Sequence, residues 1–187
     1  QINHPGKQAP AALNRETVSP SAVPFSDPNL KRFFHVPRAL TVDEIADLVR
    51  RFGETAALAK EAGFSGVQIH GAHGYLVSQF LSPRHNRRED AYGGSAENRR
   101  RFVLEVYDEI RHRVGDDFPV SIKLNSADFQ KGGFTEMEVS WYTLQLARIA
   151  RGKAPLADAG GLSSLLKVAG LIGWRRLRMG RLRAMEN

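Results

Sequence analysis

The first long apolar pattern of the chain has the spacing of an amphipathic helix. Its apolar members recur every three or four residues: Ile45, Leu48, Val49, Phe52, Ala56 and Ala59. Thr41 and Glu44 precede this stripe with the spacing of a capping box, and Gly63 follows it as a residue that ends helices well. The pattern therefore predicts a helix between Thr41 and Gly63.

Two further stretches show the same helical spacing. Ser95 is a good N-cap and Gly115 a good terminator for a second stripe, whose apolar members are Phe102, Val103, Val106, Ile110 and Val114. Thr135 and Glu138 form another capping box. They predict a third helix that runs to about Ala150.

Short apolar runs with strand-like character lie between these helices. One run covers residues 66–69, with Val67 and Ile69 alternating, and the other covers residues 120–124. The resulting order is helix, strand, helix, strand, helix. This alternation is typical of βαβ units around a parallel sheet, so we expect an α/β fold.

The remaining segments do not follow this rhythm. Residues 1–40 contain six prolines and are expected to be irregular. Residues 76–94 are expected to begin with a short apolar segment at 76–81 and to continue as a long polar loop. From Arg151 onward the chain becomes rich in leucine, glycine and arginine, without another strand-like run. We therefore divide the chain into a domain over residues 1–150 and a divergent basic tail over residues 151–187.

Charge follows the same division. The chain carries a formal net charge of +7, but its last 37 residues hold eight basic and two acidic residues, and the first 150 hold 19 basic and 18 acidic residues. The basic character belongs to the tail, so no nucleic-acid partner is expected for the domain. The chain has no cysteine, no visible secretory signal and no apolar run of the length that spans a bilayer, which makes a cytoplasmic setting the default expectation.

The candidate chemistry lies directly after the first predicted strand. His70, His73 and Tyr75 are separated only by small residues that permit a tight turn, namely Gly71, Ala72 and Gly74. The carboxyl ends of strands are where α/β folds usually build their active sites. Neutral imidazoles can hold a substrate carbonyl oxygen, and a nearby phenol can deliver a proton.

Three segments together resemble the old yellow enzyme family, which consists of FMN-dependent NAD(P)H oxidoreductases on a (β/α)8 barrel. They are residues 1–8, which read QINHPGKQ, residues 70–99 around HGAHGY and YGGS, and residues 121–125, which read SIKLN. The resemblance covers roughly four fifths of the chain and stops near Ala150. It implies a partial barrel that comprises about strands three to five with their helices.

The resemblance also implies roles for individual residues. Gln1 and Lys123 would bind FMN, at the pyrimidine edge and beside the N1 and O2 region respectively. His70 and His73 would hold the substrate oxygen, and Tyr75 would protonate the substrate carbon next to the carbonyl. The implied reaction passes hydride from NAD(P)H to FMN and then to an activated alkene, with a small molecule as the partner.

Other interpretations of the same residues remain open. Two histidines three residues apart could bind a metal, but no third ligand follows at a useful spacing, so no metal site is predicted. The histidines and Tyr75 could serve packing alone, and Lys123 could be a solvated strand end. A barrel enzyme of another chemistry is disfavoured, because the His-His-Tyr turn and Lys123 match together.

The length of the chain raises a separate alternative. A (β/α)8 barrel typically needs about 250 residues, so we expect the first two strands to precede Gln1 and the last three to follow Ala150. The tail could then be an out-of-frame product, and the chain a non-catalytic fragment whose basic tail binds an anionic membrane or nucleic-acid surface. The natural substrate, the choice between NADH and NADPH, and whether the chain forms a homo-oligomer are left open by the sequence.

Overall fold

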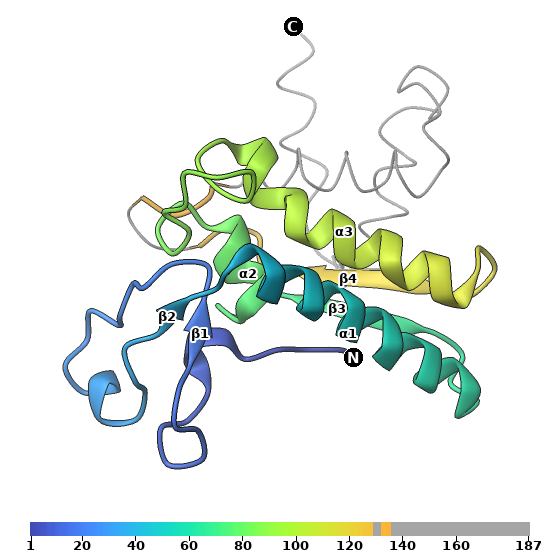
Figure 1. The fold of residues 1–187 in the computed structure, drawn as a ribbon, viewed down its shortest axis with the longest axis horizontal. Coiled ribbons are helices and arrows are strands. Elements are labelled where there is room, and N and C mark those ends of the chain that lie inside the picture. The colour runs from blue at the N-terminus through green and yellow to red at the C-terminus, as the bar shows by residue number, and fades with distance from the viewer. Residues whose placement is uncertain (129–131, 136–187) are drawn as a thin grey trace, which may run out of the picture. The chain divides into compact units, whose positions relative to one another are not determined.

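The computed structural model describes residues 1–128 and 132–135, all of which belong to one compact unit, Gln1–Thr143. The helix predicted after Thr135 and the basic tail lie outside the described residues. Along the described part, the elements follow in the order η1 (Gly6–Gln8), β1 (Val18–Ser19), η2 (Leu30–Arg32), β2 (Arg38–Ala39), α1 (Val42–Glu61), β3 (Val67–Gly71), α2 (Leu76–Leu81), α3 (Ala96–Val114) and β4 (Val120–Leu124) (Figure 1).

The centre of this unit is the parallel pair of β3 and β4. Val67 lies beside Val120 and His70 beside Lys123, and the register continues to Gly71 beside Leu124. Ile2 adds a parallel bridge to Ile69 on β3, with hydrogen bonds from the Ile2 amide to Gln68 and from the His70 amide to Ile2. The parallel arrangement predicted from the βαβ order is confirmed for this pair, and β3 ends two residues later than expected.

Side chains on these strands divide between two faces because successive residues of a strand point to opposite sides. The apolar face carries Val67 and Ile69 of β3 with Val120, Ile122 and Leu124 of β4, all of which belong to or pack against the core. The polar face carries Gln68 and His70 beside Ser121 and Lys123. Gly71 has no side chain on the crowded apolar face, where a Cβ would lie 2.9 Å from the Leu124 side chain.

Helix α1 begins and ends where the sequence predicts. The Thr41 hydroxyl accepts a hydrogen bond from the Glu44 amide, and the Glu44 carboxylate accepts one from the Thr41 amide, so the capping box is complete. The helix ends at Glu61, and Gly63 then takes a φ of +84°. This conformation is costly for a residue with a Cβ, which explains the glycine at this position.

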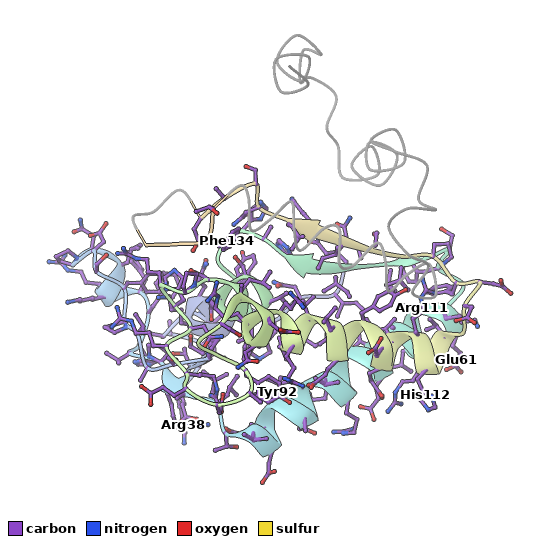
Figure 2. All side chains as sticks on the ribbon, turned by 90° about the horizontal axis from the view of Figure 1, so that it is seen from above. Arg38, Glu61, Tyr92, Arg111, His112 and Phe134 are labelled. Atoms are coloured by element: carbon purple, nitrogen blue, oxygen red, sulfur yellow. The ribbon has the colours of Figure 1, made fainter. Side chains whose placement is uncertain are left out.

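Helix α3 likewise begins after the predicted N-cap, with the Ser95 hydroxyl accepting from the Asn98 amide, and ends before Gly115. It packs against α1, and Figure 2 shows the β3–β4 pair to one side of both helices. Phe102 is fully buried at this contact, stacked on Phe80 of α2 at 4.3 Å between ring centroids and edge-on to Phe52 of α1 at 6.2 Å. Aromatic contacts therefore join the three helices.

Two segments differ from the expectation of irregular structure. Residues 76–81 form the helix α2, whose six residues are all buried. Within the first 40 residues, β1 and β2 form a short parallel pair in which Val18 lies beside Arg38. No helix in the described ranges, 1–128 and 132–135, is long and apolar enough to span a membrane.

Candidate active site at the carboxyl end of the parallel strands

The site is built by the turn that leads from β3 into α2. His70 is the last residue but one of β3, and Tyr75 is the N-cap of α2. Between them, His73 and Gly74 both take positive φ values, +60° and +71°. A left-handed conformation is costly for a residue with a Cβ. Because it is occupied here by a histidine, backbone strain coincides with a candidate functional residue.

The turn brings the three aromatic side chains together. The ring centroids of His70 and His73 are 5.0 Å apart, those of His70 and Tyr75 are 5.1 Å apart, and those of His73 and Tyr75 are 6.5 Å apart. All three pairs meet edge to face. The three rings therefore form one cluster, with His70 at its centre.

Local contacts determine which nitrogen of His70 carries the proton. The Ala72 amide donates to His70 Nδ1 at 3.3 Å, so Nδ1 acts as an acceptor and the neutral ring carries its hydrogen on Nε2. Burial is the main cause that lowers the pKa of His70 below its usual 6.5, and the nearby His73 and Lys123 lower it further. A neutral imidazole with Nε2–H can donate a hydrogen bond to a ligand oxygen.

The backbone of His73 is held from two sides. Its amide donates to the Asn125 side-chain carbonyl at 3.0 Å, and its carbonyl accepts from the Gln8 side-chain amide at 2.8 Å. Next to it, the carbonyl of Gly74 accepts from the buried Gln79 at 2.6 Å. The Gln8 and Asn125 contacts come from residues distant in sequence, and all three contacts support the strained turn that carries the imidazole.

Lys123 lies beside His70 in the register of β4, on the polar face. Within residues 1–128 and 132–135 its ammonium forms no ion pair, so its charge is available to a ligand. Gln1 lies at the start of the segment bridged to β3, and its side-chain amide donates to the Gln68 side chain at 2.7 Å. The structure thus places Gln1 next to a residue of the polar face, whereas the histidines and Tyr75 contact one another directly.

Other polar residues of the family-like segments form hydrogen bonds to the backbone. The His4 ring accepts a hydrogen bond from the Gly6 amide. Arg88 donates to the carbonyls of Pro20 and Leu40, and Arg99 donates to those of Leu81 and Gly94. In the described ranges, no group of three histidine or carboxylate side chains could hold a metal ion.

A cavity of about 890 Å³ adjoins the turn. Its wall includes His73, Asn125 and several basic side chains, among them Lys7, Lys31 and Arg87. No function was predicted from the sequence for these basic residues, nor for Asn125 and Gln8. Gln8 and Asn125 both lie in segments that carry the family resemblance, which is the signal that could have identified them.

Comparisons with known proteins identify the family of the chain. Residues 1–158 match the NADH:flavin oxidoreductase / NADH oxidase family, a match that continues past Ala150. The chain is 44% identical over 137 residues to an NADH oxidase of Thermoanaerobacter brockii, an alignment that covers 72% of this chain and 20% of the relative. It is 40% identical over 135 residues to an NADPH dehydrogenase of a Geobacillus species, an alignment that covers 72% of this chain and 37% of the relative.

Among solved structures, an old yellow enzyme homologue from Zymomonas mobilis superposes with a TM-score of 0.64 at 32% identity, over 75% of this chain and 41% of that one. The chain spans about a fifth to two fifths of the length of the curated relatives it matches. Family members of this type use FMN with NAD(P)H. The sequence match over most of the chain, joined to the superposition, shows that this chain belongs to the NADH:flavin oxidoreductase / NADH oxidase family.

Proposed function

We propose that this protein is an FMN-dependent NAD(P)H oxidoreductase that reduces activated alkenes, such as α,β-unsaturated carbonyl compounds. The observation that carries the proposal is the clustering of His70, His73 and Tyr75 beside Lys123 at the carboxyl end of the parallel strands. In this proposal, the segment at Ile2, β3 and β4 are the third to fifth strands of a (β/α)8 barrel.

The donor set of the polar face fits FMN. The flavin pyrimidine edge alternates hydrogen-bond acceptors and donors, and the amide of Gln1 can serve both. The ammonium of Lys123 suits the N1 and O2 region, where negative charge gathers on the reduced ring. When bound, FMN supplies the hydride that it has taken from NAD(P)H.

His70 and His73 would hold the carbonyl oxygen of the alkene substrate. His70 offers Nε2–H because its Nδ1 accepts from the Ala72 amide. Two donors on one oxygen draw electron density from the conjugated double bond, which makes the carbon β to the carbonyl more electrophilic. The strain at His73 and its support by Asn125 and Gln8 fit a requirement for fixed geometry.

Tyr75 would provide the proton that completes the reduction. As hydride bonds to the β carbon, the C=C electron pair moves to the α carbon, which takes the phenol proton of Tyr75. The products are the saturated carbonyl compound and a phenolate, which water reprotonates. The phenol ring lies 5.1 Å from that of His70, within reach of a substrate held by the histidines.

The test begins with an FMN titration of the 187-residue chain, in which flavin fluorescence and absorbance are monitored. Saturable binding with a perturbed spectrum is expected if the chain forms the site. In a chain that binds FMN, Tyr75→Phe should slow alkene reduction at least tenfold while sparing flavin reduction by NAD(P)H. Equal losses in both half-reactions would contradict the role of Tyr75 as proton donor.

A second variant addresses the histidines. Replacing both His70 and His73 by alanine should weaken the binding of phenol-type ligands while leaving FMN bound. Tyr107→Phe, which removes a hydroxyl that accepts a hydrogen bond from Arg111 on α3, provides a control remote from the turn. An unchanged ligand affinity in the double variant would remove the histidines from the site.

A further inference from the structure

The cavity beside His73 is basic. Four cationic side chains line it, Lys7, Lys31, Arg84 and Arg87, against two carboxylates, Asp27 and Asp128. Both carboxylates already accept hydrogen bonds: Asp27 from the Asn29 amide, and Asp128 from the Ser82 hydroxyl and the Phe134 amide. These six side chains together carry a formal excess of two positive charges.

Lys7 is the unusual member of this group because it is only 2% exposed. Its ammonium contacts the Val23 carbonyl at 3.1 Å and His85 Nδ1 at 3.0 Å, and it lies 4.5 Å from the centroid of the Phe25 ring. All of these partners are neutral. Among the residues that the structure describes, no carboxylate pairs with it. A buried ammonium without a counter-charge is unfavourable, and a bound anion would offset its cost.

Lys31 and Arg87 add two cations at the exposed side of the cavity. Neither forms an ion pair within residues 1–128 and 132–135. The Arg87 amide is bonded to the Ser21 hydroxyl at 2.9 Å, which anchors its backbone on the wall while leaving the guanidinium to the cavity. An anion in the cavity would therefore meet one buried cation and two accessible ones.

We propose that this cavity binds an anionic group, a carboxylate or a phosphate, of the ligand whose reactive end meets His70 and His73. The inference deepens the proposed function, on which it rests for the placement of the reactive end. His73 and Gly74 belong to the cavity wall as well as to the turn, so one ligand can occupy both places. The volume of about 890 Å³ accommodates a tail of drug-like size.

The test compares two probes of the same shape on the 187-residue chain without flavin, by calorimetry. One is 3-(4-hydroxyphenyl)propanoate and the other is its primary amide, so that only the charge of the tail differs. The carboxylate should bind about tenfold more tightly, as expected for charge-assisted hydrogen bonds. The preference should shrink as salt is added.

The variants assign this preference to the cavity. Arg87→Gln combined with Lys31→Gln should bring the carboxylate close to the affinity of the amide, and both sites are exposed, so folding is expected to survive. Arg15→Gln removes an exposed cation outside the cavity lining and should leave the preference unchanged. Equal binding of the two probes, or an equal loss in Arg15→Gln, would overturn the inference.

A second pair of probes identifies the source of the anion. Dihydronicotinamide mononucleotide and its riboside differ by one phosphate, so a preference for the mononucleotide assigns the cavity to the reductant. A preference confined to the propanoate assigns it to the oxidising substrate. These results are independent of the FMN titration. A charge preference without FMN binding supports the anion site in the cavity and contradicts the proposed redox function. FMN binding without a charge preference supports the redox function and contradicts the anion site.

Discussion

The two faces of the β3–β4 pair differ in the kind of side chain that they carry. The side chains of the apolar face belong to or pack against the core that includes Phe52 of α1 and Phe102 of α3. The polar face carries Gln68, His70, Ser121 and Lys123, and β4 is only half-buried along its whole length. One face of the same five-residue strands therefore supports folding, and the other carries the candidate chemistry.

This difference indicates where substitutions should act. Loss of a core side chain removes buried apolar surface and leaves a cavity, whereas loss of a side chain on the polar face removes hydrogen-bond donors or charges. Stability and ligand binding should thus respond to separate sets of residues.

Phe102→Ala should cause the largest loss of stability. Phe102 is fully buried between Phe80 and Phe52, so its removal should lower the free energy of unfolding by about 3–5 kcal/mol. Urea unfolding followed by circular dichroism measures this change. Lys123→Gln on the polar face is the comparison and should change stability by less than about 0.5 kcal/mol. Similar losses in the two variants would contradict the division between faces.

Thr41→Ala should give a smaller effect, restricted to the helical layer. It removes the hydroxyl that accepts from the Glu44 amide at the start of α1, which should cost about 1 kcal/mol. Thr55→Ala, in the same helix, is the matched control, since the Thr55 hydroxyl only donates back to the Arg51 carbonyl. A loss in Thr55→Ala as large as in Thr41→Ala would show that capping is not the cause.

Asn125→Ala tests the support of the strained turn. The substitution leaves the amide of His73 without its 3.0 Å partner, at a cost of about 0.5–1.5 kcal/mol in stability. Its main effect should be weaker binding of phenol-type ligands, because the imidazole is no longer held in place. Asn125→Asp retains the acceptor and should restore binding. Failure of the aspartate variant to bind better than the alanine variant would argue against this hydrogen bond.

The pH response should be the most local effect. The pKa of His70 lies below 6.5, chiefly because the ring is buried, with further contributions from His73 and Lys123. As the pH falls below 6.5, the His70 ring takes up a proton more readily in the unfolded chain than in the folded chain. The contribution of His70 therefore lowers the free energy of unfolding toward acidic pH. A titration of the histidine ring signals by NMR should give His70 a pKa below 6.5. A pKa of 6.5 or above for His70 would contradict the desolvation of its ring.

Much of the helical layer could be predicted from sequence because its signals are local. The capping box at Thr41 and the N-cap at Ser95 each depend on residues three positions apart, and both appear as expected. Helix α2 was missed for a physical reason. All six of its residues are buried, so it shows no alternation between apolar and polar faces.

The candidate site could be predicted only in part for a related reason. His70, His73 and Tyr75 follow one another within six residues, so their clustering was visible in the sequence. The bond from His73 to Asn125 spans 52 positions and depends on the pairing of β3 with β4. The basic cavity likewise gathers residues from η1, η2 and the loop after α2, which share no local pattern.

The left-handed backbone at His73 has a consequence for how this turn can change over generations. Glycine adopts a φ of +60° without the steric cost that a histidine bears, so His73→Gly should leave the folded state as stable as before or more so, while removing one imidazole from the site. Selection for stability alone would therefore favour loss of the side chain at this position. Under the proposed function, the presence of His73 is a trade-off in which stability of the turn is given up for a second imidazole at the site.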